Sequence, residues 1–205
     1  MVKKYNKYNY LTSTSTSAEQ SPKELIKLLK DGNNRFVNNK VFNQNLNEIL
    51  KETCEGQDPK ISIVGCIDSR VPHEIIFDLH KGDIFSIRIA GNIINDDILG
   101  SLEFSSGVKN VTLIVVLGHS KCGAVMAAMN KSSVPKKFGE LHKLIRKVKL
   151  NDNDVNTNIK HNVENSVQEI KSHLLKKNII KNENIIVIGA IYDVCTGKVQ
   201  FIEEE

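Results

Sequence analysis

Residues 61–70 read ISIVGCIDSR, and residues 111–122 read VTLIVVLGHSKC. Each segment begins with a short apolar, β-branched run, which is typical of a buried strand, and ends in side chains that can bind a metal. Together the two segments supply two thiols, an imidazole and a carboxylate: Cys66, Cys122, His119 and Asp68. Ligands of open α/β sheets gather beyond the carboxyl ends of the parallel strands, so we expect these side chains to lie close together.

Two thiolates, an imidazole and a carboxylate form a ligand set of four-coordinate zinc. A site that only stabilises a fold more often uses paired CxxC knuckles. Asp68 and Arg70 are separated by one residue just beyond the expected strand, so their side chains can point the same way and form a charge-assisted contact. We therefore predict one zinc ion per chain, held by Cys66, His119 and Cys122, with water or Asp68 in the fourth position.

The rest of the chain alternates between strand and helix patterns. Apolar, β-branched runs predict strands at residues 61–65, 84–89, 111–117, 184–191 and 198–202. Helical spacing and capping residues predict helices at residues 22–36, 46–54, 72–77, 97–108, 136–150 and 159–177, and another that begins near residue 123. This alternation predicts an α/β fold with a mostly parallel central β-sheet, flanking helices and an antiparallel edge strand near the C-terminus.

Residues 1–20 are rich in Lys, Tyr, Asn, Ser and Thr and lack the apolar core of a secretory signal. We expect a disordered tail there and a single domain over residues 21–205, with organelle targeting by the tail as an open alternative. No apolar run approaches the roughly 18 residues of a membrane span. The net charge of +4 includes three lysines and one glutamate in the tail, so the domain is nearly balanced, which argues against nucleic-acid binding.

Four cysteines in 205 residues are too few for a disulfide scaffold. Thiolates that bind a metal must stay reduced, so we expect a reducing compartment, the cytoplasm. Cys54 and Cys195 belong to no motif and are expected to be small core or near-surface residues. His73 is expected to be an exposed histidine at the start of a helix, with a role as proton carrier as the less favoured alternative.

Residues 66–92 and 115–125 resemble the β-class carbonic anhydrases, chiefly through CxDxR at 66–70 and HxxC at 119–122. The resemblance extends over residues 22–203. It implies the fold of that family and a zinc-dependent lyase (carbonate dehydratase) in which zinc hydroxide reversibly hydrates carbon dioxide to bicarbonate and a proton. It also implies a homodimer or homotetramer with active sites close to subunit contacts.

The resemblance also suggests roles for single residues. In the family an aspartate–arginine pair keeps the aspartate off the metal, where it accepts a hydrogen bond from zinc hydroxide, although in some members the aspartate binds zinc in an inactive form. Asp68 and Arg70 match this pair. Gln57, nine residues before Cys66, matches a glutamine that hydrogen-bonds the substrate. The other matches line the expected substrate pocket: Phe85, Ala90, Gly91 and Gly123. Gly123 is expected to allow close packing where its helix begins.

Two alternative functions stay open at this point. Relatives on the same scaffold hydrolyse carbonyl sulfide or carbon disulfide with the same metal site, and the sequence does not separate this reaction from hydration of carbon dioxide. A non-catalytic structural zinc domain would require none of Asp68, Arg70 and Gln57. Because two thiolates cancel the charge of zinc, a bound water should be less acidic than on a tris-histidine zinc, so we expect activity to rise toward alkaline pH.

Overall fold

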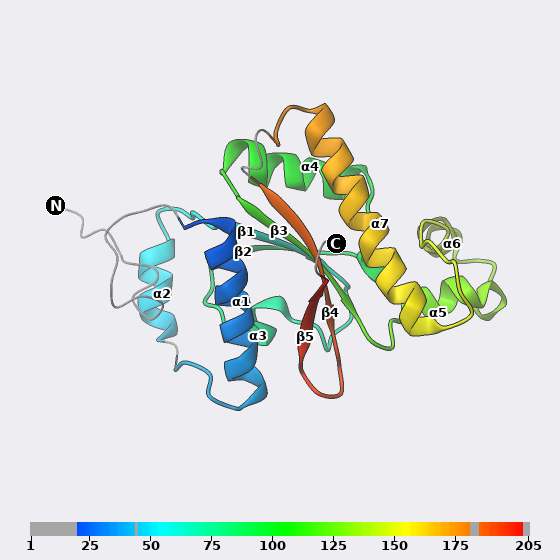
Figure 1. The fold of residues 1–205 in the computed structure, drawn as a ribbon, viewed down its shortest axis with the longest axis horizontal. Coiled ribbons are helices and arrows are strands. Elements are labelled where there is room, and N and C mark those ends of the chain that lie inside the picture. Colours follow the sequence, from blue (N-terminus) through cyan, green and yellow to red (C-terminus); the bar gives the residue numbers. More distant parts are fainter. Residues whose placement is uncertain (1–19, 44, 181–184, 203–205) are drawn as a thin grey trace.

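The computed structural model describes residues 20–43, 45–180 and 185–202, so nearly all of the expected N-terminal tail lies outside the described residues. Five strands form one sheet in the order β2-β1-β3-β4-β5 (Figure 1). Their bounds are β1 Ile61–Gly65, β2 Ile84–Arg88, β3 Leu113–His119, β4 Ile186–Tyr192 and β5 Val199–Ile202. The first four strands are parallel and β5 pairs antiparallel with β4, which confirms the expected fold class.

The helices mostly follow the expected segments. They are α1 Pro22–Val37, α2 Leu46–Thr53, α3 His73–Ile76, α4 Asp96–Glu103, α5 Gly123–Met129, α6 Gly139–Ile145 and α7 Val155–Lys176. The described residues also contain three short turns of other helix types: η1 Ala90–Asn92, η2 Phe104–Val108 and η3 Lys131–Ser133. The segment expected as one helix over residues 97–108 changes from α-helix to π-helix at Phe104.

Two further helices differ from expectation by three residues or more at one end or both. The helix expected at residues 159–177 begins four residues earlier, at Val155, because Asp154 caps it by accepting a hydrogen bond from the Thr157 N–H. The helix expected at residues 136–150 is limited to α6. The start of α1 follows expectation, since Ser21 and Glu24 form a reciprocal capping box.

Alternate side chains of the central strands face two separate helical layers, as the period of two in a strand requires. On one face, β1 and β3 pack with α1 and α3 through Ile61, Ile63, Leu113 and neighbouring buried residues. On the other face, Val64 and Val116 belong to a cluster with α4 and α7. Figure 1 shows α1 and α3 on one side of the sheet and α7 on the other.

The order of the strands creates a reversal at the centre of the sheet. From β1 the chain passes outward to β2, whereas from β3 it passes the opposite way to β4, and β1 and β3 are neighbours. Open α/β sheets bind their ligands at the carboxyl ends of the strands that flank such a reversal. Residues that follow β1 and residues at the end of β3 therefore share the position where a site is expected. Within the described part of the chain, no helix is both long and apolar enough to cross a bilayer.

Candidate metal centre

Three potential metal ligands meet at this position. The thiol sulfurs of Cys66 and Cys122 and a ring nitrogen of His119 all lie within 4.8 Å of one another, and all three residues are buried. Cys66 directly follows β1, His119 ends β3, and Cys122 precedes α5. The structure therefore brings together two segments that lie about fifty residues apart in the sequence.

The histidine is oriented for metal binding. Its Nδ1 lies 3.0 Å from the carbonyl oxygen of Ser120, to which it donates when that nitrogen carries the proton. Its Nε2 is buried and has no hydrogen-bond partner among the described residues. A carbonyl partner at one ring nitrogen fixes the tautomer whose other nitrogen can bind a metal. The end of β4 supports this arrangement, because Ser120 donates its N–H to Tyr192 O and accepts the N–H of Val194 on its hydroxyl.

The two thiols share a hydrogen bond. The hydrogen bond with Cys122 lowers the pKa of Cys66, and the same hydrogen bond, together with burial, raises the pKa of Cys122. Cys66 is therefore the more acidic of the two thiols. A divalent cation binds both sulfurs as thiolates and displaces their protons. The donor set, two sulfurs and one free imidazole nitrogen, fits zinc with one further coordination position.

Asp68 is held by Arg70, not by the three-residue cluster. Arg70 donates from its backbone N–H and its Nε to Asp68 Oδ1, at 3.0 Å and 2.9 Å, and from Nη2 to Oδ2 at 2.7 Å. This bidentate contact holds the pKa of Asp68 well below its usual range and raises the pKa of Arg70. The carboxylate is thus kept ionised beside His119 and Cys66, and it can only accept hydrogen bonds.

Arg88, which we did not single out from the sequence, supports the loop that carries Cys66 and Asp68. It ends β2 directly beside Gly65 in the sheet register. Its Nε donates to the carbonyl oxygen of Cys66 at 3.0 Å and its Nη2 to that of Asp68 at 2.6 Å. An arginine at the carboxyl end of the neighbouring strand was the available signal, but its target could be identified only once the strand order was known.

Two of the expected pocket residues, Ala90 and Gly91, are neighbours in η1, and Gly91 contacts the sulfur of Cys66. Gly91, which follows Ala90 in η1, donates its N–H to Cys66 Sγ at 3.2 Å. Gly91 has φ +70°, and a Cβ there would lie 2.9 Å from the Cβ of Ala124, so only glycine fits. The expectation for Gly123 was wrong in one respect. A Cβ at Gly123 would meet nothing within 4 Å among the described residues, so this glycine leaves open space instead of allowing close packing.

Gln57 and Phe85 lie toward the opposite edge of the sheet from the cluster. Gln57 is an exposed loop residue before the amino end of β1, whereas Cys66 follows its carboxyl end. Five residues of β1 separate the two edges by about 16 Å. Phe85 pairs with Ser62 near the amino end of the sheet and contacts Phe104, with ring centroids 6.4 Å apart. Within one chain, the structure therefore does not bring Gln57 and Phe85 to the metal ligands.

The expectation of an exposed His73 was wrong. The residue is fully buried because Gly65 on β1 has no side chain: a Cβ there would lie 2.1 Å from His73 Nε2. His73 Nδ1 lies 2.9 Å from the hydroxyl of Ser86, while Nε2 has no partner among the described residues. Burial, reinforced by the charge of Arg88, lowers the pKa of His73 to about 4. A buried, neutral imidazole with this pKa does not suit a proton carrier at neutral pH.

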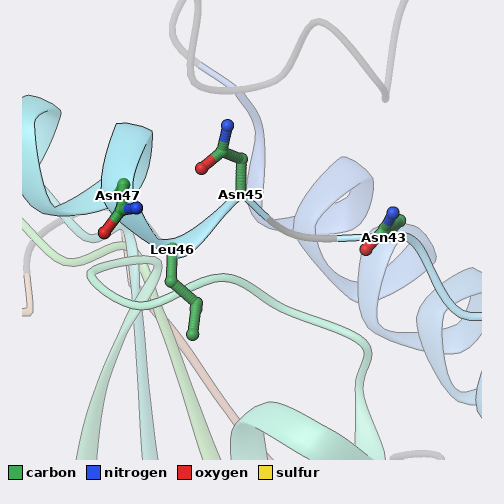
Figure 2. Close-up of a pocket in the computed structure, with 4 residues that line it drawn as sticks. All are labelled: Asn43, Asn45, Leu46 and Asn47. Atoms are coloured by element: carbon green, nitrogen blue, oxygen red, sulfur yellow. The ribbon is translucent and has the colours of Figure 1, made fainter.

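A shallow hollow at the start of α2 is not part of this centre. It is lined by Asn43, Asn45, Leu46 and Asn47 (Figure 2). Its lining contains three amides and one leucine, and none of these side chains is a nucleophile or an ionisable group. The other two cysteines, Cys54 and Cys195, are free and exposed, in keeping with the near-surface alternative.

Comparison with known proteins identifies the relatives of this chain. The family model for carbonic anhydrase matches residues 61–199, which include the three potential ligands. Carbonic anhydrase 2 of Mycobacterium tuberculosis is 44% identical over 119 residues, which are 56% of this chain and 58% of that protein. The carbonic anhydrase of Candida albicans is 30% identical over 190 residues, 83% of this chain and 66% of that protein. This chain thus matches less than two thirds of the length of these curated relatives.

A solved structure agrees with the sequence relatives. The β-carbonic anhydrase CafA of Aspergillus fumigatus is 29% identical and superposes with a TM-score of 0.62, covering 77% of this chain and 82% of that one. The family model covers well over half of this chain, and the CafA likeness adds the same class of fold. The chain therefore belongs to the β-class carbonic anhydrase family.

Proposed function

We propose that this chain is a zinc-dependent carbonic anhydrase, a lyase that reversibly converts carbon dioxide and water to bicarbonate and a proton. The observation that carries the proposal is the buried cluster of Cys66, His119 and Cys122 next to an ionised Asp68 that Arg70 holds outside the cluster. Three protein ligands with a further position free are typical of catalytic zinc, whereas structural zinc is closed by four. A structural site would have no use for the Asp68–Arg70 pair.

One zinc ion per chain would be held by the sulfurs of Cys66 and Cys122 and by Nε2 of His119. Zinc supplies Lewis acidity, which makes a water molecule acidic enough to act as a nucleophile near neutral pH. The charge of two thiolates moderates this acidity, so the rate should rise toward alkaline pH.

Asp68 would orient the reacting water. Its carboxylate is ionised and its bidentate contact with Arg70 fixes its plane, so it can accept a hydrogen bond from that water but cannot donate one. Accepting this hydrogen bond leaves the lone pair of the water oxygen directed away from Asp68 and available for the carbon of carbon dioxide. Arg70 keeps Asp68 ionised throughout the cycle and keeps it from becoming a metal ligand.

Carbon dioxide is small and apolar, and the free space beside Gly123 suits it. Ala90 and Gly91 would form the neighbouring wall, since the backbone of Gly91 touches the sulfur of Cys66. No described side chain occupies the space that a Cβ of Gly123 would fill, and Gly123 directly follows Cys122, so we propose that substrate approaches the cluster there.

Gln57 and Phe85 would act in a neighbouring copy of the chain. They lie near the amino edge of the sheet, so a role at the metal requires that a second subunit present them. Phe85 is on β2, an edge strand whose outer side is available for such a contact. We propose a homodimer, or a homotetramer built from dimers, in which these residues complete the partner's pocket.

The four cysteines are free, and the two buried ones must stay reduced to bind zinc. The cytoplasm is therefore the compartment we propose.

Stopped-flow hydration of carbon dioxide between pH 6.5 and 9, with zinc measured in the same sample, tests the proposal. We expect about one zinc per chain and a rate that rises with pH. Asp68→Asn keeps the shape of the side chain but removes its charge, and we expect it to lower kcat/KM by about 100-fold. The matched control is Asp31→Asn, which among the described residues breaks only the exposed pair of Asp31 with Lys27 on α1.

Different failures have different meanings. Full zinc content without hydration at any pH would refute the proposed activity, and carbonyl sulfide and carbon disulfide would then be the substrates to test. Full zinc content without turnover of any of the three would leave a structural zinc domain.

A further inference from the structure

The sulfur of Cys66 is contacted by a backbone amide from outside the cluster. The N–H of Gly91 donates to this sulfur at 3.2 Å, and both residues are buried. A hydrogen bond to a thiolate withdraws part of its negative charge, so the thiolate donates less to a metal. The position of Gly91 therefore affects how acidic a bound metal is.

Gly91 is held in place by α7, on the far face of the sheet from α1. The side-chain amide of Asn162 donates to the carbonyl oxygen of Gly91 at 2.9 Å, and the hydroxyl of Ser166 donates to that of Asn92 at 3.3 Å. Asn162 is only 3% exposed, and its neighbour Val163 is fully buried against the sheet. A long helix anchored in the core thus fixes a turn that lies 71 residues away in the chain.

The turn needs an external anchor because its backbone is unusual. Gly91 and Asn92 both have positive φ, +70° and +44°, and η1 contains only three residues. Such a short turn has few hydrogen bonds of its own. Without Asn162, the Gly91 carbonyl would lose a buried partner, and the peptide on either side of the Gly91 Cα could rotate.

We propose that Asn162 is a positioning residue that, through Gly91, directs the N–H of that glycine at the Cys66 thiolate and so adjusts the charge that the thiolate gives to the metal. This inference rests on the proposed function only in taking the metal to be zinc. If the anchor is lost, the N–H···S contact weakens and the thiolate becomes more electron-rich. The metal should then be less Lewis-acidic, and the activity profile should move to higher pH.

The test uses the full chain loaded with Co²⁺ in place of zinc, whose thiolate-to-cobalt charge-transfer band reports the electron density on sulfur. We expect Asn162→Ala to move this band to longer wavelength and to shift the zinc enzyme's pH profile upward, because both follow from a more electron-rich thiolate. The control is Asn165→Ala, on the same helix, because among the described residues Asn165 donates only to His161 O within α7. We expect the control to keep the wild-type band.

A purely structural role for Asn162 would lower thermal stability without moving the band, and that result would overturn the inference. If Asn162→Ala does not fold, Asn162→Ser leaves room for a water that satisfies the Gly91 carbonyl without fixing its position, and the same shift is expected. A wild-type chain that shows the cobalt band but does not hydrate carbon dioxide would refute the proposed function while this test of Asn162 could still be completed.

Discussion

Burial of His73 should make the fold sensitive to mild acid. The imidazole is neutral in the folded chain because burial lowers its pKa from 6.5 to about 4. Between these two pH values the unfolded chain binds a proton that the folded chain does not, so stability must fall as the pH falls. The full effect, reached near pH 4, corresponds to about 3 kcal/mol at 1.36 kcal/mol per pKa unit, and about 2 kcal/mol of it is lost by pH 5.

Urea unfolding of metal-free protein at pH 7 and pH 5 measures this effect, with a chelator present so that metal release does not contribute. His73→Asn removes the titrating group, so the variant should lose about 2 kcal/mol less stability than the wild type between the two pH values. His161→Asn, on α7, is the matched control and should behave like the wild type. If the wild type and His73→Asn lose equal stability, the burial argument is refuted.

Three further substitutions test other parts of the site. Arg88→Lys removes the two hydrogen bonds from Arg88 to the carbonyl oxygens of Cys66 and Asp68. Zinc affinity, measured by chelator competition, should then fall about tenfold. Unchanged affinity would show that the loop that carries Cys66 and Asp68 holds its shape without Arg88. Gly123→Ala should leave the melting temperature unchanged, because its Cβ meets no described atom, but should slow hydration in a stopped-flow assay; an unchanged rate would remove Gly123 from the pocket. Gly65→Ala would drive a methyl group into the ring of His73 and should cost about 1–3 kcal/mol in urea unfolding; the addition of His73→Ala should relieve much of this loss, and purely additive effects would contradict the clash.

The sequence was sufficient to predict that Cys66, His119 and Cys122 lie together, because their signal is local. Cys66 follows one apolar run and His119 ends another. The carboxyl ends of neighbouring parallel strands lie at the same edge of the sheet. The start of α7 could also have been predicted, since Asp154 is a favoured capping residue. The residues that follow Asp154 are mostly polar, however, so the first turn of the helix shows no apolar spacing.

The supports of the site could not be predicted in the same way. The role of Arg88 depends on which strand lies beside β1, and the role of Asn162 depends on which face of α7 meets a turn that lies 71 residues earlier. The burial of His73 depends on the absence of a side chain at Gly65, on a strand whose neighbours were not known. Each of these contacts joins distant segments, and a periodic pattern in one segment carries no information about the other.

Three separate elements restrain the two ligand segments. Arg88 on β2 restrains the Cys66 loop, Asn162 on α7 restrains the glycine that touches its sulfur, and the end of β4 restrains Ser120 next to His119. β2 lies beside β1 on one side of the strand reversal, β4 lies beside β3 on the other, and α7 covers one face of the sheet. The ligands of a catalytic metal must stay close to one geometry while one position remains free, so the restraint that a fourth protein ligand would provide has to come from the surrounding fold. It follows that substitutions far from the cluster in sequence should alter metal affinity and acidity more than substitutions of exposed residues next to it, such as Ile67.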